Sequence, residues 1–271
     1  SPRSALSPMP RACTRVRSPV HVALLRGSYA DADGNISLRQ ECANLDQFDL
    51  ALAAHNSGGT VIVQVRTAVD VGTIPARDVH IPGAWVDAVV VDPEQSATYD
   101  VAYDPTLTGE LRGPVPDRED EPFSERIAVA RRAALELRAD AVVNYGFGMP
   151  DLVARIVSER GDTGRYYQTI EHGVYGGDLL TGRLFGFGRN ATAYIHGPSQ
   201  FDFYGGGGLD LAFLGFGEFD ASGNVDVSML GGVRRLVLRP YIFQTMPAAV
   251  AMIAMTTTLP QASANSGLSR Y

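Results

Sequence analysis

Short apolar runs rich in valine recur along the chain, and they constrain its fold more than any other feature. Each run is bounded by Gly, Asn, Asp or Pro, which is the pattern of strands buried on both faces of a sheet. The runs occupy residues 22–25, 60–65, 86–91 and 141–143. The sequence therefore predicts one or more parallel sheets.

Segments with a helical pattern lie between these strands. Residues 45–54 end before a Ser-Gly-Gly turn, and residues 124–137 begin with Ser followed by Glu. Residues 150–159 have Pro in the first turn, and Gly161 lies just beyond their end. Strands that alternate with helices of this length predict an α/β fold with open, mostly parallel sheets and flanking helices.

A proline-rich segment divides the chain. Residues 92–122 contain five prolines and an acidic stretch, which is typical of a surface linker. An Asp-Ala-x-Gly-Asn turn follows a predicted strand both at residues 31–35 and at residues 220–224, so the two halves carry a weak repeat. We therefore expect two related domains. The expected boundaries are a poorly structured segment at 1–20, a first domain at 21–115, a linker at 116–124, a second domain at 125–232 and an atypical segment at 233–271.

Composition excludes several classes of function. The 271 residues carry a formal net charge of -7, and no long basic run is present, which argues against a nucleic-acid partner. All 23 basic residues are arginine, so a Walker A loop and a Schiff-base lysine are both excluded. An arginine bias this complete suggests a GC-rich bacterial genome.

Compartment and metal content follow from equally simple observations. Two cysteines are too few for a disulfide scaffold, no secretory signal is recognisable, and the apolar run at 248–255 is too short to cross a bilayer. We expect a cytoplasmic protein without a membrane segment. The five histidines show neither metal-ligand spacing nor a Gly-x-Ser-x-Gly elbow, so we expect no metal and no triad hydrolase.

Glu171 is a lone carboxylate at the point where an apolar strand breaks into glycine. It follows a predicted strand at 166–170 and precedes Gly173 and the pair at 176–177. Ligands gather at the carboxyl ends of strands in open α/β sheets, so Glu171 is a candidate nucleophile. The alternative is a carboxylate that caps a turn. His172 either tunes this carboxylate or, as we favour, is a solvent-facing turn histidine.

Two glycine-rich segments could complete a site around this carboxylate. Residues 144–150 join a strand to a helix start, where backbone N–H groups often bind anions, although a tight turn without a ligand fits equally well. It is not a Rossmann fingerprint, because Asp151 stands in place of the third glycine. Residues 205–208 are four glycines that follow an aromatic stretch and lead into a strand.

Together these segments resemble the family I coenzyme A transferases, and most of all the fused propionate and acetate/ketoacid CoA-transferases. The resemblance implies that Glu171 carries an acyl group and then CoA as a thioester. It also implies substrates rather than a permanently bound cofactor: an acyl-CoA and a short-chain carboxylic acid, as in short-chain fatty acid and ketone body metabolism. The remaining residues implied are Gly146, Phe147 and Gly148 for the oxyanion or CoA pocket, and Gly173, Gly205, Gly206 and Gly207 for the substrate pocket.

The resemblance runs from about residue 22 to residue 232, which implies that each of the two CoA-transferase-type domains is incomplete. Relatives follow the second Gly-Asn turn with a Gly-x-Gly-Gly loop that supplies another oxyanion donor, whereas residues 234–240 here have no such glycines. Two alternatives to a CoA-transferase therefore stay open. One is an inactive or partner-dependent fragment that binds acyl-CoA or another subunit, either a second copy or a complementary chain. The other is an acyl-CoA hydrolase.

Overall fold

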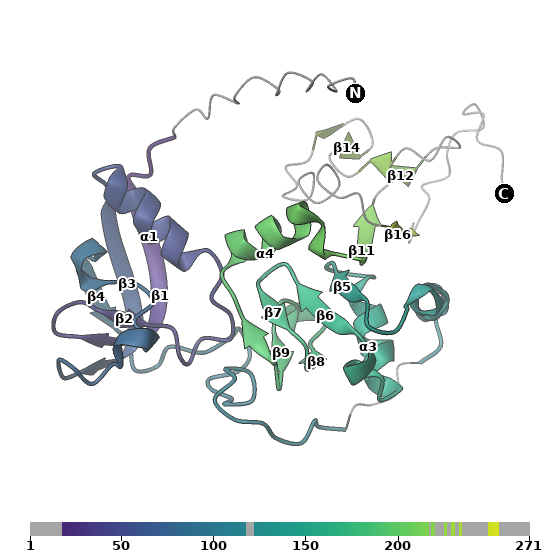
Figure 1. Cartoon of the computed structure of the whole chain (residues 1–271), viewed down its shortest axis with the longest axis horizontal. Coiled ribbons are helices and arrows are strands. Elements are labelled where there is room, and N and C mark those ends of the chain that lie inside the picture. Colours follow the sequence, from purple (N-terminus) through teal and green to yellow (C-terminus); the bar gives the residue numbers. More distant parts are fainter. Residues whose placement is uncertain are drawn as a thin grey trace, which may run out of the picture.

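The computed structural model describes residues 18–117 and 122–216, together with the backbone of short strands up to residue 254. Its elements form two α/β units that lie side by side, each built around its own sheet (Figure 1). The mostly parallel sheets and flanking helices confirm the predicted fold class.

The first sheet has four strands in the order β2-β1-β3-β4. The strands β1, β3 and β4 are parallel, and the short β2 is antiparallel at one edge. The bounds are β1 Val22–Asp31, β2 Ile36–Ser37, β3 Thr60–Val69 and β4 Ala88–Val91, with the short 3₁₀ helices η1 Ala76–Asp78 and η2 Gly83–Trp85 before β4.

The helix α1, Gln47–Asn56, covers only one face of this sheet. Its residues Ala51 and Ala54 are fully buried against alternate residues of β1 and β3. Side chains alternate between the two faces of a strand, so Val22 and Leu24 point to the opposite face. That face is open, and Leu24 is 77% exposed. The first unit therefore presents one apolar sheet face that no helix covers within the described residues.

The second sheet has six strands in the order β10-β7-β6-β5-β11-β16. Its four strands β6, β5, β11 and β16 are parallel, and at one edge the short β7 pairs antiparallel with both β6 and β10. The bounds are β5 Val142–Tyr145, β6 Tyr167–Ile170, β7 Val174–Tyr175, β10 Ala193–Tyr194, β11 Leu211–Phe216 and β16 Ala249–Ala254.

Helices α2 and α3 supply the core of this second unit. Ser124 caps α2, Glu125–Ala133, because its side chain accepts a hydrogen bond from the Ile127 backbone N–H. The apolar side of α3, Asp151–Glu159, packs with α2 against β5 and β11, where Tyr145 and Phe213 stack at 5.6 Å between ring centroids.

The other elements of the second unit are short. They are η3 Ala134–Glu136, η4 Thr163–Arg165, β8 Asp178–Leu179, η5 Gly182–Leu184, β9 Gly188–Arg189, α4 Gly197–Phe203 and the π-helical turn η6 Tyr204–Gly208. Two further hairpins pair β12 Glu218–Phe219 with β13 Val225–Asp226 and β14 Met229–Leu230 with β15 Val233–Arg234.

Part of the proline-rich connection packs against the two units, although most of its residues are exposed. Leu107 is fully buried in a cluster that also contains residues of both units. Its carbonyl accepts a 2.6 Å hydrogen bond from the Tyr194 hydroxyl, and Asp104 forms a 2.9 Å ion pair with Arg189. The prediction of a surface linker over all of 92–122 was therefore wrong for this part, because a buried leucine and paired charges hold it on the second unit.

The terminal segments predicted at 1–20 and 233–271 fall mostly outside the described residues, apart from 18–20, β15 and β16. The second Asp-Ala-x-Gly-Asn turn, at 220–224, also lies outside them, as does most of the segment at 234–240 where relatives have their glycine loop. In the first copy, Asp31 Oδ1 accepts hydrogen bonds from the backbone N–H groups of Asp33 and Asn35, which explains the turn.

Candidate active site

Glu171 directly follows β6, in the turn that leads into β7. The Gly173 N–H donates to the Ile170 carbonyl at 3.0 Å, and Gly173 has a φ of 85°. A Cβ at this position would lie 2.1 Å from the Ile195 carbonyl oxygen, so only glycine fits the turn. This tight turn places the Glu171 carboxylate at the carboxyl end of the sheet.

A cleft of about 1170 Å³ opens between the two units, and Glu171 is part of its wall. Its volume lies slightly above the usual range for ligand pockets, and its lining is mostly apolar with a few polar groups. The second unit contributes Glu171, His172, Gly197, Pro198, Phe201 and Asp202, and the first unit contributes Leu24, Leu25, Arg26, Leu45, Asp46, Gln47, Leu50, Ile62, Gln64 and Val90.

Buried polar side chains lie behind the carboxylate. The Asn144 side-chain Nδ2 donates to Glu171 Oε2 at 3.4 Å and to the Tyr204 hydroxyl at 3.2 Å. The Tyr204 hydroxyl also lies 2.5 Å from Thr169 Oγ1. Burial raises the pKa of Tyr204, and the negative charge of Glu171 adds to that shift, so this phenol keeps its proton at neutral pH.

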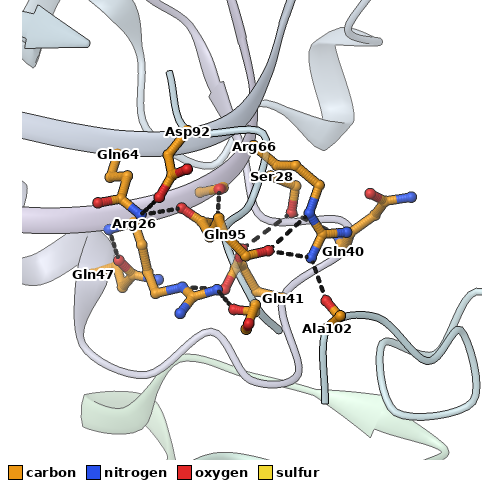
Figure 2. A network of polar contacts seen from close by, with 12 residues as sticks. Arg26, Ser28, Gln40, Glu41, Gln47, Gln64, Arg66, Asp92, Gln95 and Ala102 are labelled. Carbon is orange, nitrogen blue, oxygen red and sulfur yellow. Dashed lines mark hydrogen bonds and ion pairs between the residues drawn. The ribbon is translucent and has the colours of Figure 1, made fainter. Parts of the chain in front are cut away.

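A polar network holds the wall of the cleft that the first unit provides (Figure 2). The Arg26 Nε lies 2.7 Å from Glu41 Oε2, and the Arg26 backbone N–H donates to Gln47 Oε1 at 2.7 Å. The Gln95 amide bridges Glu41 Oε1 and the Gly27 carbonyl and accepts from Gln64. Burial raises the pKa of Glu41, and Arg26 opposes that shift. The network fixes a guanidinium and two amides on the cleft wall.

His172 is a half-buried turn residue that lines the cleft, and its role in tuning Glu171 stays a prediction. Its ring packs edge-on against Phe185 at 6.0 Å, and its Nδ1 is buried without a hydrogen-bond partner among the described residues. Burial, with a smaller contribution from Asp49, raises the pKa of Asp46, and the His172 imidazole opposes this shift. Asp46 of the first unit lines the same cleft as His172.

The turn from residue 146 to 148 lies beside the cleft rather than in its wall. The Gly146 N–H donates to the Phe213 carbonyl at 2.9 Å, so it is not available to an oxyanion. The half-exposed Phe147 ring packs against Phe185, which in turn contacts His172. Gly148 has a φ of 94° with open space beside it. Ring contacts thus connect this turn to the Glu171 segment.

The run of four glycines is also absent from the lining of the cleft. Gly205, Gly206 and Gly207 belong to the π-helical turn η6, in which Gly207 has a φ of 93°. Gly173 shapes the turn next to Glu171 without lining the cleft itself. The α4 residues Phe201 and Asp202, just before the run, line it instead.

Sequence reasoning missed the contribution of the first unit. Leu24, Arg26 and Gln64 lie on the open face of the first sheet, and a pattern of buried strands does not show which face another unit will border. Asn144 and Tyr204 were also missed. Tyr204 precedes the run of four glycines and Asn144 lies two residues before Gly146, and only the pairing of β5 with β6 and the hydrogen bonds between these side chains show that they approach Glu171.

Other kinds of site are not supported within the described part of the chain. No group of three or more His, Cys, Asp or Glu side chains is placed to hold a metal ion. Burial raises the pKa of the free Cys42 thiol to about 12, which makes it a poor nucleophile. None of the described helices has the length and apolar character needed to cross a bilayer.

Comparison with known proteins shows which family this sequence and fold resemble. The coenzyme A transferase family model matches residues 15–92. The caffeate CoA-transferase of Acetobacterium woodii is 44% identical over 210 residues, which cover 76% of this chain and 40% of that protein.

Solved structures of the acyl-CoA transferase YdiF from Escherichia coli O157:H7 are similar as well. Its apoenzyme superimposes with a TM-score of 0.73 and 36% identity over 83% of this chain and 42% of that chain. Its thioester complex with CoA gives a TM-score of 0.68 and 37% identity over 79% and 39%. The chain thus spans about 40% of the length of the curated relatives that it matches. On its sequence and its fold, the chain belongs to the coenzyme A transferase family.

Proposed function

We propose that this protein is a CoA-transferase that moves coenzyme A between an acyl-CoA and a free carboxylate through a thioester on Glu171. The observation that carries the proposal is the position of Glu171, at the carboxyl end of β6 in the wall of the large cleft, with the Asn144 amide as a donor. The relative YdiF, solved as a thioester complex with CoA, supports the same chemistry.

The proposed reaction needs no group beyond the carboxylate and the two substrates. A Glu171 oxygen attacks the thioester carbonyl, the C–S bond breaks, and CoA leaves as a thiolate. The thiolate then attacks the Glu171 carbonyl of the mixed anhydride, so that the first acid leaves and a glutamyl-CoA thioester remains. An incoming carboxylate then attacks the glutamyl-CoA thioester and releases the CoA thiolate. The thiolate attacks the acyl group of the new mixed anhydride, which forms the new acyl-CoA and frees Glu171. Coenzyme A is therefore a substrate, and we propose no permanently bound cofactor.

Each tetrahedral step places negative charge on an oxygen, which backbone N–H donors can stabilise. We propose that Phe147 and Gly148 provide such donors for the bound thioester. Gly146 is left out of this role, because its N–H already donates to Phe213. The ring contacts from Phe147 through Phe185 to His172 support this placement, since they keep the turn close to the Glu171 segment.

The acceptor that we propose is a short-chain carboxylic acid. Apolar side chains from both units suit an acyl chain, and the Arg26 guanidinium on the opposite wall suits an anion. One relative is named for caffeate, so an aromatic acid is the competing substrate class. We also propose that the reaction takes place in the cytoplasm, where a free buried thiol such as Cys42 stays reduced.

The test is a transfer assay with propionyl-CoA and acetate, in which acetyl-CoA is separated and measured by liquid chromatography. The wild-type protein should form acetyl-CoA, and Glu171→Gln should form none above background. Glu125→Gln, which changes an exposed glutamate at the start of α2, is the matched control and should retain the activity. Release of free CoA without acetyl-CoA would instead identify a hydrolase. A folded wild-type protein that forms neither product would contradict an enzymatic role.

A further inference from the structure

Three polar side chains behind Glu171 are almost completely removed from solvent. Asn144 and Thr169 are 0% exposed and Tyr204 is 1% exposed. They come from β5, from β6 and from the end of α4, and hydrogen bonds connect them into a chain that ends at the Glu171 carboxylate. A polar group without a partner is costly in such a place, so the contacts that each one makes are strongly specified.

The direction of every hydrogen bond in this chain follows from one fixed acceptor. Thr169 Oγ1 lies 2.9 Å from the Val143 carbonyl and must donate its only hydroxyl proton there. It can therefore only accept from Tyr204, at 2.5 Å. The Tyr204 hydroxyl, having donated, can only accept from Asn144, at 3.2 Å.

This order decides which end of the Asn144 amide faces Glu171. With the Asn144 NH₂ group on the side of Tyr204, one of its protons meets the Tyr204 hydroxyl and the other points at Glu171 Oε2. With the amide reversed, the Asn144 oxygen would face the carboxylate and repel it. The Asn144 Oδ1 has no hydrogen-bond partner among the described residues, so the amide is held from its NH₂ side, by Tyr204 and by Glu171 itself.

The glycine run brings Tyr204 to this position. Tyr204 is the first residue of η6, where the chain turns from α4 into β11. Gly207 adopts a φ of 93°, which favours glycine, and a Cβ at Gly208 would lie 2.1 Å from the Phe203 ring, so that this ring would have to move. The four glycines thus act on the site through Tyr204 rather than by lining the cleft.

We propose that Tyr204 is a positioning residue for the reaction, which holds the Asn144 amide so that its N–H groups, and not its oxygen, meet Glu171. The inference rests on the proposed function of Glu171. A donor held against the attacking carboxylate keeps one oxygen engaged and directs the other toward the thioester. Tyr204 acts only through Asn144, so its effect should disappear when Asn144 is removed.

The chain supplies a matched control for the test. Tyr145 is also a fully buried tyrosine, and its hydroxyl has no hydrogen-bond partner among the described residues. It follows Asn144 on β5, so its side chain points to the opposite face of the sheet, where it stacks on Phe213. Tyr145→Phe therefore removes the same atom from a similar environment without touching the chain of hydrogen bonds.

The experiment measures the single-turnover rate of glutamyl-CoA formation at a series of acetyl-CoA concentrations. Tyr204→Phe should lower the maximal rate about 2- to 10-fold, and Asn144→Ala about 10- to 100-fold, with the half-saturating concentration unchanged in both. The double variant should be no slower than Asn144→Ala alone, because the two residues act in series. Tyr145→Phe should match the wild type.

Two results would overturn the inference: a wild-type rate in Tyr204→Phe, or a double variant whose loss equals the product of the two single losses. If the wild-type protein forms no adduct, the proposed function fails. The positioning role of Tyr204 is then tested without the reaction, by the side-chain amide signals of Asn144 in NMR spectra. They should shift in Tyr204→Phe and in Glu171→Gln but not in Tyr145→Phe. Unchanged signals in Tyr204→Phe would contradict the positioning role whatever the activity.

Discussion

The side-chain amide of Asn144 lies 3.4 Å from the carboxylate of Glu171, although 27 residues separate them in the sequence. Parallel pairing of β5 with β6 brings them together, since Asn144 is paired with Thr169, two residues before Glu171. The contact puts a neutral donor beside the proposed nucleophile in a site closed to solvent from behind.

Replacing this donor by a carboxylate should be worse than deleting it. Asn144→Asp would place a second negative charge beside Glu171, and two unit charges about 4 Å apart repel by roughly 4 kcal/mol near a protein surface. We expect transfer activity to fall more than in Asn144→Ala, by at least about 100-fold. The transfer assay measures both variants, and Asn56→Asp at an exposed position is the control. Equal activity of Asn144→Asp and the wild type would contradict the contact.

Gly173 should not tolerate even a methyl group. Gly173→Ala combines a left-handed backbone with a Cβ only 2.1 Å from the Ile195 carbonyl, so we expect a loss of roughly 3 kcal/mol in the free energy of unfolding. Gly58→Ala has a similar φ of 71° with nothing within 4 Å, and should lose only about 1 kcal/mol. Urea denaturation compares the two. Equal losses would show that the turn can adjust.

The buried ion pair behind the cleft should contribute more than an exposed pair. Arg26→Met leaves the Glu41 carboxylate, which is only 6% exposed, without its cation. We expect a loss of roughly 2 kcal/mol in unfolding free energy, below the value for a fully buried pair because Arg26 is partly exposed. Arg39→Met removes an exposed pair with Asp78 and should cost at most about 0.5 kcal/mol. Similar losses for the two variants would contradict the larger contribution expected from the ion pair between Arg26 and Glu41.

His80 should make the fold less stable in mild acid. Burial lowers the pKa of His80 from its usual 6.5, with a smaller effect of the His196 ring in the same direction, while Asp78 opposes the shift. The unfolded state therefore takes up a proton first as the pH falls. Stability from this group is complete above pH 6.5 and is lost as the pH falls from there through the lower pKa of the folded state.

Thermal unfolding at pH 7.5 and pH 5.5 tests this linkage. The decrease in Tm on acidification should be smaller in His80→Gln than in the wild type. His21→Gln, at an exposed histidine, is the control and should show the wild-type decrease. An unchanged decrease in His80→Gln would assign the pH dependence to other groups.

Much of the fold was predictable because the apolar runs are local signals. The runs at 60–65 and 141–143 lie in β3 and at β5, and the helices predicted at 45–54 and 150–159 match α1 and α3 within a few residues. The packed connection was not predictable in the same way. Prolines and charges predict a surface segment, and the burial of Leu107 depends on packing with residues far away in the sequence, such as Cys42 and Leu180.

The site was predictable only where strand and glycine meet. Glu171 and the need for Gly173 follow from one short segment, whereas Asn144, Tyr204 and the first-unit wall depend on packing between distant elements. The run of four glycines does mark a sharp turn of the backbone. The residue that contributes to the site there is the adjacent Tyr204. Local sequence signals show where the backbone is unusual, and they do not show what that backbone positions.

The proposed transfer reaction requires that Glu171 becomes covalently attached to coenzyme A. The most direct test is the intact mass of the purified protein after incubation with acetyl-CoA and reduction with borohydride, measured beside Glu171→Gln and followed by peptide mapping. The proposed mechanism predicts the mass change of a reduced glutamyl thioester, located at Glu171 in the wild type and absent from the variant. A folded wild-type protein without this change, or the same change in Glu171→Gln, would contradict it.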